Sequence, residues 1–169
     1  MPRRAAACLS VLFFVLGPCL EAGVGPFLLT GGWDQGSDLP AQPFWTVLGV
    51  ALVCAGLAVV VRAFVAFAVD GRGTPTPAAP TDRLVVSGAY RHVRNPMYLA
   101  TAAMIVGEGL VLARPILLVA AAAYLATLAV LTTRLEEPTL AARFGAPYED
   151  YRRAVPGWVP RLRPWSPGG

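Results

Sequence analysis

Residues 97–133 read MYLATAAMIVGEGLVLARPILLVAAAAYLATLAVLTT and carry only two charged side chains, Glu108 and Arg114. A helix needs about 20 apolar residues to cross the hydrocarbon core of a bilayer, where backbone amides without partners are not tolerated. The interruption at Arg114-Pro115 therefore predicts two membrane helices, 97–113 and 115–133, joined by a tight hairpin. Proline suits the start of the second helix, where its missing N–H costs nothing.

Two further apolar runs lie before this hairpin, at 5–30 and 44–69. Only 14% of the residues are charged and 56% are hydrophobic, whereas soluble domains carry about 25% charged residues. We therefore expect an all-α integral membrane protein with about four transmembrane helices. The predicted organisation is a transmembrane domain, 1–133, which includes a loop at 70–96, and a cytosolic C-terminal segment, 134–169, that begins as a helix and ends as a proline-rich tail.

The arginines predict the orientation. Twelve of the 14 basic residues lie in three regions, at 3–4, 72–94 and 134–163, and 31–43 has none. The excess of arginine on cytoplasmic loops then places both termini and the 70–96 loop in the cytosol. Arg3-Arg4 before an apolar run also resembles a signal peptide, but no convincing cleavage site lies near Leu20 to Gly23, so we expect the segment to be retained.

Several classes of function do not fit this composition. The net charge is +4, and there is no lysine. The arginines lie between apolar runs and form no basic surface interleaved with aromatic residues, so we expect no nucleic-acid partner. Cys8, Cys19 and Cys54 lie in apolar segments without a CxxC pair or a histidine cluster, so we expect neither a metal site nor a disulfide framework.

The densest group of polar side chains is SGAYRHVRNPMY, residues 87–98, at the start of a predicted membrane helix. One interpretation is an interfacial anchor, because tyrosine and arginine favour the depth of the lipid headgroups. That interpretation accounts for Arg91, Arg94 and Tyr98. It accounts less well for His92, the only histidine, and for Asn95. Ligand binding is the other interpretation, and the residues alone do not choose between them.

Two smaller groups are weaker signals. Glu136-Glu137 follows the last predicted helix and is either a solvated helix end or part of a site. Glu108 lies about 16 Å along its helix at 1.5 Å per residue, between Gly107 and Gly109. An ionisable group at that depth suggests a functional site. The alternative is that Glu108 pairs with Arg114 while the glycines allow close helix packing.

These groups together resemble a known family. GRGTPTP at 71–77, LVVSGAYRHVRNPMY at 84–98 and EEPTL at 136–140 are followed by Phe144-Gly145, Tyr148, Tyr151 and Val155-Pro156. The chain over about 44–163 resembles the bacterial isoprenylcysteine carboxyl methyltransferase-like family, which belongs with the membrane phospholipid methyltransferases. The two main motifs, in order and flanking a helical hairpin, carry the resemblance.

The resemblance implies S-adenosylmethionine bound at the cytosolic face of a bacterial inner membrane, with a lipid-like acceptor arriving from the inner leaflet. Arg94, Tyr98 and Arg134 would be the catalytic residues. Glu136 would be a direct cofactor ligand. The full set of implied cofactor residues is Leu84, Val85, Tyr90, His92, Arg94, Asn95, Pro96, Tyr98, Gly107, Glu108, Gly109, Glu136 and Glu137.

The chain departs from the family pattern in two places. Asn95 stands where the family often has histidine, and an amide cannot titrate. Arg134 is close to the position of the arginine that guides the acceptor in the family, but its register does not match well. The soluble GxGxxG turn is absent, so a dinucleotide-type methyltransferase is not supported.

Two hypotheses of different classes follow. The first is a membrane methyltransferase whose acceptor is a prenylcysteine-type carboxylate or thiol, or a phospholipid amine. The second is a non-catalytic helical scaffold or partner subunit whose motif residues are interfacial anchors. Binding of S-adenosylmethionine separates the two.

The arginine distribution makes a topology prediction. Reporter fusions after residue 36 and after residue 78 should fall on opposite sides of the membrane, with 36 outside, because 31–43 lacks arginine and the 70–96 loop is rich in it. Finding residue 78 outside would overturn the orientation and remove the 84–98 motif from the cytosol.

Overall fold

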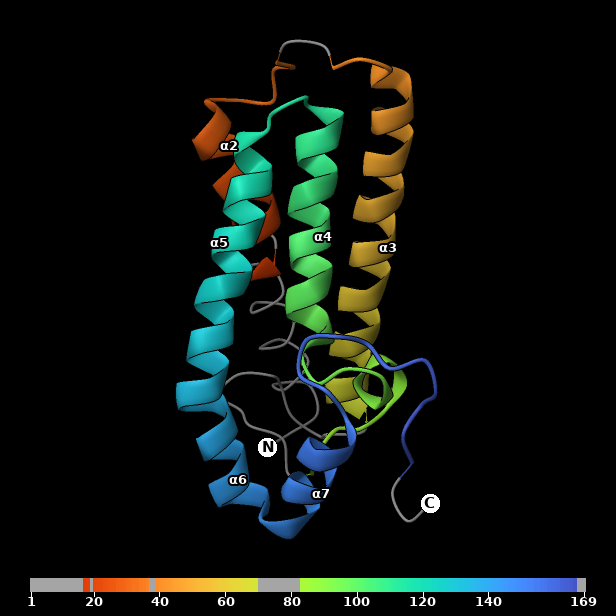
Figure 1. The fold of residues 1–169 in the computed structure, drawn as a ribbon, viewed down its shortest axis with the longest axis vertical. Helices are drawn as coiled ribbons and strands as arrows, with labels where there is room; N and C mark the ends of the chain where they lie inside the picture. The colour runs from red at the N-terminus through yellow and green to blue at the C-terminus, as the bar shows by residue number, and fades with distance from the viewer. Residues whose placement is uncertain (1–16, 19, 37–38, 70–82, 167–169) are drawn as a thin grey trace. The chain divides into compact units, whose positions relative to one another are not determined.

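The computed structural model describes residues 17–18, 20–36, 39–69 and 83–166, which contain helices, turns and irregular segments only. This confirms the all-α prediction for these residues. Figure 1 shows the elements. In chain order they are the π-helical turn η1 (Leu20–Val24), α2 (Gly25–Thr30), α3 (Gln42–Val69), the 3-10 turn η2 (Gly88–Arg91), α4 (Pro96–Val111), α5 (Ile116–Leu131), the π-helical turn η3 (Thr132–Glu136), α6 (Glu137–Phe144) and α7 (Ala146–Ala154).

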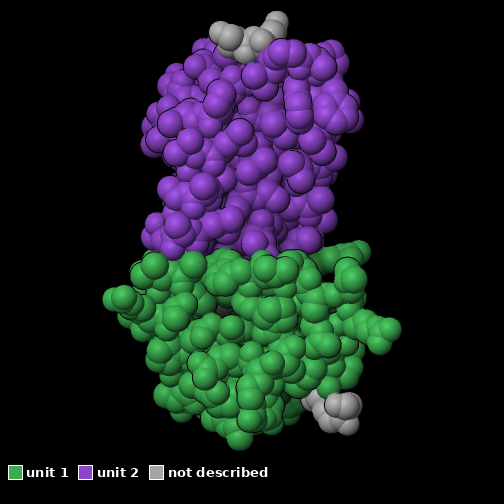
Figure 2. Space-filling model, in the orientation of Figure 1, with its two compact units in different colours: residues 1–13, 61–96, 129–169 green, residues 14–60, 97–128 purple. Residues whose placement is uncertain are grey.

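The chain divides into two compact units (Figure 2). Unit 1 comprises residues 1–13, 61–96 and 129–169. Unit 2 comprises residues 14–60 and 97–128. Parts of two predicted segments lie outside the described residues. They are residues 5–16 of the predicted helix 5–30 and residues 70–82 of the predicted loop 70–96.

Two helices are long and apolar enough to cross a membrane. One covers Gln42–Phe67 and the other Ile116–Phe144, in which α5, η3 and α6 follow without a break. The described part of the first predicted helix, Leu20–Thr30, and the third, Pro96–Val111, are shorter apolar helices. At 1.5 Å per residue, α4 is only about 24 Å long. The count of four membrane spans therefore stays a prediction.

The predicted hairpin between 97–113 and 115–133 is present, and its connector lies in unit 2. Its connector is slightly longer than predicted, because α4 ends at Val111 and α5 begins at Ile116. Ala113 adopts a positive φ of 50° there, and the amide of Arg114 donates to the carbonyl of Gly109 at 2.9 Å. Pro115 lies immediately before the helix, where its carbonyl accepts from the Leu118 amide at 3.0 Å.

Glycines set the contact between α3 and α4 in unit 2. A Cβ on Gly107 would lie 2.6 Å from the carbonyl oxygen of Gly49, and a Cβ on Gly49 would lie 2.5 Å from that of Gly107. Two turns further along α3, a Cβ on Gly56 would lie 2.7 Å from the carbonyl of Ala100. Small residues let helix backbones approach closely where lipid supplies no hydrophobic drive for association. Gly107 is therefore a packing residue.

Glu108 does not pair with Arg114, contrary to one interpretation of the sequence. The Arg114 guanidinium donates to the backbone carbonyl of Asp34 at 3.3 Å instead. Oε2 of Glu108 is buried and has no hydrogen-bond partner. Gly109 contributes to packing, because a Cβ there would lie 3.1 Å from Cβ of Leu117 on α5. Both glycines of this element thus have a structural role in unit 2.

We predict that Gly107→Ala lowers the free energy of unfolding in detergent by about 1–3 kcal/mol, the usual effect of overpacking. Gly23→Ala is the matched control, because a Cβ at that position meets nothing within 4 Å. Chemical unfolding followed by circular dichroism measures both. If the two variants were equally stable, the close contact between α3 and α4 would be wrong.

Candidate active site

A partly buried ion pair joins two distant parts of the chain within unit 1. Nη1 of Arg94, just before α4, lies 2.5 Å from Oε1 of Glu137, at the start of α6. Their side chains are only 15% and 13% exposed. A charge removed from water this far needs a partner with hydrogen-bond geometry. The pair therefore fixes the 84–98 motif to the Glu136-Glu137 motif.

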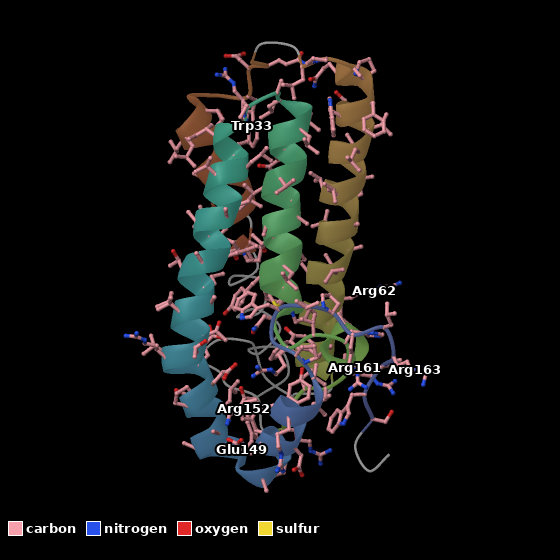
Figure 3. All side chains as sticks on the ribbon, viewed as in Figure 1. Trp33, Arg62, Glu149, Arg152, Arg161 and Arg163 are labelled. Atoms are coloured by element: carbon pink, nitrogen blue, oxygen red, sulfur yellow. The ribbon has the colours of Figure 1, made fainter. Side chains whose placement is uncertain are left out.

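The carboxylate of Glu137 has a second cation nearby. Arg152 on α7 lies 3.7 Å from Oε2 of Glu137 and 3.0 Å from Oε2 of Glu149. Figure 3 labels Arg152 and Glu149. Arg152 is far more exposed than Arg94, at 45% of its side chain. It therefore contributes less to fixing the carboxylate than Arg94 does.

The π-helical turn η3 contains Glu136 and lies directly before Glu137. It ends at Glu136, and Glu137 begins α6 directly after it. A π turn inserts one extra residue per turn and is frequent at functional sites, because it turns the following side chains away from the ordinary helical register. Thr132, its first residue, is 3% exposed, and its hydroxyl has no hydrogen-bond partner.

Two tyrosines of α7 belong to a cluster of buried apolar side chains in unit 1. Tyr148 and Tyr151 are 2% and 3% exposed. With Val155 they pack against Leu84 and Val86, at the start of the 84–98 motif. The hydroxyl of Tyr151 donates to the carbonyl of Tyr90 at 2.7 Å. This bond ties α7 to η2.

Burial keeps both tyrosines in their neutral form. It raises the pKa of the Tyr151 phenol. It also raises the pKa of Tyr148, with the charge of Glu137 adding to the effect. A neutral phenol is a donor, so the bond from Tyr151 to the Tyr90 carbonyl is retained across the physiological pH range.

The C-terminal tail, residues 156–165, runs beside the motif and binds its backbone. The carbonyl of Pro156 accepts from the Arg94 amide at 2.9 Å, and the amide of Arg161 donates to the His92 carbonyl at 2.9 Å. The amide of Trp165 donates to the Arg91 carbonyl at 2.9 Å. Three backbone contacts therefore hold the tail along the motif.

Side chains of the motif bind the same tail. Nδ2 of Asn95 donates to the carbonyl of Gly157 at 3.1 Å. Nδ1 of His92 lies 2.8 Å from the carbonyl of Arg161, so it carries the proton, because a carbonyl only accepts. Nε of Arg91 donates to the carbonyl of Trp165 at 2.7 Å. This pattern explains why an amide serves at position 95: the group opposite is a backbone acceptor.

The structure assigns the residues predicted for the site to two units. Unit 1 contains ten of them: Leu84, Val85, Tyr90, His92, Arg94, Asn95, Pro96, Arg134, Glu136 and Glu137. Val85, Tyr90, Asn95 and Pro96 are buried, Glu136 is half-buried, and Arg134 is exposed. Unit 2 contains Tyr98, which is half-buried, and Gly107, Glu108 and Gly109.

Sequence reasoning missed the contribution of α7 and the tail to the site. The sequence motif includes Tyr148 and Tyr151 but indicates no role for them. Their spacing of three residues, on one face of a helix, was the available signal. No such signal marks the backbone acceptors of the tail, because every residue carries a carbonyl whatever its type. These acceptors are the carbonyls of Pro156, Gly157, Arg161 and Trp165.

These features describe a helical membrane protein with a polar, partly buried site built from the residues before one helix and after another. The chain belongs to the phospholipid methyltransferase family, whose sequence model matches residues 44–147. Members of this family use S-adenosylmethionine to methylate phospholipid-like acceptors. The match begins in α3 and ends just before Tyr148, so most of α7 and the tail lie beyond it. No curated protein and no solved structure matches the chain.

We predict that Glu137→Gln destabilises the protein by about 3 kcal/mol, because it leaves the partly buried Arg94 guanidinium without its counter-charge. Glu149→Gln is the matched control: its carboxylate also contacts Arg152, but it is 39% exposed and should cost less than about 1 kcal/mol. Equal losses in urea-induced unfolding would mean that the Arg94–Glu137 pair contributes no more than a surface contact.

Proposed function

We propose that this protein transfers a methyl group from S-adenosylmethionine to a lipid-like acceptor that arrives from the inner leaflet. Membership of the phospholipid methyltransferase family is the observation that carries the proposal. The family and the apolar helices make the protein an integral membrane protein. A bacterial inner membrane and cytosolic termini are the further parts of the proposal, and they are supported by the arginine distribution and the resemblance.

The residues of unit 1 fit this cofactor. Nε of Arg94 is buried and has no hydrogen-bond partner, although its Nη1 is held by Glu137. A buried donor without an acceptor costs about 1–3 kcal/mol, and the cofactor's carboxylate would relieve that cost. Glu136, which precedes Glu137 in the sequence, is half-buried and would accept from an ammonium or from ribose hydroxyls.

The bound cofactor supplies a methyl group already activated on a sulfonium cation. The protein then has mainly to align donor and acceptor and exclude water. In this proposal Glu137 holds Arg94 in place, and Tyr151 and the tail fix the backbone of the motif around it. Arg134, exposed on η3, would bind an anionic group of the acceptor.

The acceptor is proposed to be a phospholipid amine, because the matching family is that of the phospholipid methyltransferases. A phospholipid amine must lose a proton when it is methylated, whereas a prenylcysteine-type carboxylate has no proton to lose. The prenylcysteine-type carboxylate or thiol is the second acceptor to test, because the motifs also resemble that branch.

A specific observation favours the non-catalytic alternative. Arg91, His92, Arg94 and Asn95 all bind groups of the protein itself, namely Glu137 and the carbonyls of the tail. A scaffold stabilised by these contacts would need no ligand. Measuring cofactor binding distinguishes this alternative from the enzyme.

We predict micromolar binding of S-adenosylmethionine or its demethylated product in detergent, measured by calorimetry. Glu136→Ala should weaken it roughly 10- to 150-fold, the loss of one charged hydrogen bond. Glu149→Ala, a carboxylate on α7 that pairs with Arg152, should change it little.

Transfer of labelled methyl groups to phosphatidylethanolamine and to a prenylcysteine substrate then identifies the acceptor. Absence of binding by the wild-type protein would favour the scaffold, and equal effects of the Glu136 and Glu149 variants would remove Glu136 from the site.

A further inference from the structure

The tail that binds the motif has a second, outward side. Its inner side is formed by Gly157, Arg161 and Trp165, at intervals of four residues, whose backbone groups bind Asn95, His92 and Arg91. Between them, Val159 is 74% exposed and Leu162 is 96% exposed. Arg163 beside Leu162 is also exposed.

Contacts between the tail and the rest of unit 1 fix the tail in the position that exposes Val159 and Leu162. Backbone bonds at Pro156, Arg161 and Trp165 hold the tail at three points. Nη1 of Arg161 also donates to the carbonyl of Ala154 at 2.8 Å, and the ring of Trp165 lies 5.6 Å from that of Tyr151. Prolines at 156, 160 and 164 restrict the backbone between these points. Val159 and Leu162 are therefore held away from the core of unit 1.

The charge beside these apolar side chains indicates what covers them. Leu162 lies between Arg161 and Arg163 in the sequence, and unit 1 also exposes Arg62 on α3 (Figure 3). Apolar side chains alternating with arginine are typical of segments that bind at the headgroup level of a bilayer. Anionic lipids attract each such arginine by about 1 kcal/mol.

Unit 1 also contains exposed apolar side chains on an apolar helix that is long enough to cross a membrane. Val61 and Val65 lie on one side of α3, one turn apart, and are 44% and 55% exposed. Both belong to the apolar stretch Gln42–Phe67, which is long enough to span a membrane. The unit that carries the tail therefore also contains the end of a membrane helix.

We propose that the outer side of the tail, Val159, Leu162 and Arg163, docks on the surface of an anionic bilayer. Val159 and Leu162 enter the headgroup region, and Arg163 binds lipid phosphates. Because the inner side of the same tail binds Arg91, His92 and Asn95, this docking connects the lipid surface to the candidate active site. The proposal is independent of methyl transfer, since it depends only on exposure and charge.

The test places an environment-sensitive fluorophore on Leu162→Cys in the full chain, with the three native cysteines replaced by alanine. Asp150→Cys, on α7 and 61% exposed, is the matched control. Both proteins are reconstituted in nanodiscs of phosphatidylcholine, with or without phosphatidylglycerol, and quenched by lipids spin-labelled at the headgroup. The label at 162 should be blue-shifted and quenched, more strongly with phosphatidylglycerol and less at high salt, whereas the label at 150 should not.

Adding Arg163→Gln to Leu162→Cys should lower the ratio of docked to free tail about fivefold in the anionic discs. The proposal would be overturned by equal emission spectra of the labels at 162 and 150. It would also be overturned if quenching at 162 were the same with and without phosphatidylglycerol. A blue shift without lipid quenching would also overturn it and would indicate a protein partner or a second copy. Calorimetry with S-adenosylmethionine in the same discs reports separately on the proposed function, so the two can fail independently.

Discussion

The ion pair between Arg94 and Glu137 is the interaction on which unit 1 depends. It connects a segment that precedes α4 with the helix that follows η3, 43 residues further along the chain. Both side chains are largely withdrawn from water, so each is tolerable only because the other is present. The π turn at Thr132–Glu136 lies directly before Glu137 and changes the register of the helix at the acidic pair.

The C-terminal tail extends this arrangement. The segment around Arg94 has no regular secondary structure apart from η2, so its backbone groups need partners from elsewhere. The tail supplies them at Arg91, His92 and Arg94, and Tyr151 supplies one at Tyr90. The family match ends at residue 147, so these partners belong to the part of the chain that the family comparison does not describe. A site that looks local in the sequence is thus completed by a distant segment.

In unit 2 the main constraint is close packing of helix backbones. Its apolar side chains gain little from leaving lipid, so its helices associate through close backbone approach at Gly49, Gly56 and Gly107. The same glycines explain why Gly107-Glu108-Gly109 is ambiguous in the sequence: a motif used for ligand binding in a family and a motif used for helix packing contain the same residue type. Glu108, with its buried and unpartnered Oε2, is the part of this element that packing does not account for.

The sequence alone determined the helical class of the described residues and the hairpin around Arg114-Pro115, because apolar length and proline position depend on local chemistry. The grouping of the two polar motifs was implied by the family resemblance. The sequence also identified Arg94 and Glu137, but not as partners of each other, since a pair 43 residues apart in sequence leaves no periodic signal. Only the tertiary structure decided that Asn95 and His92 bind carbonyls of the tail, that Arg114 binds Asp34 and not Glu108, and that α4 ends at Val111. The physical reason is the same for these side-chain contacts: a backbone carbonyl or amide is present at every residue, so which one a side chain reaches is set by the fold and not by the residue type.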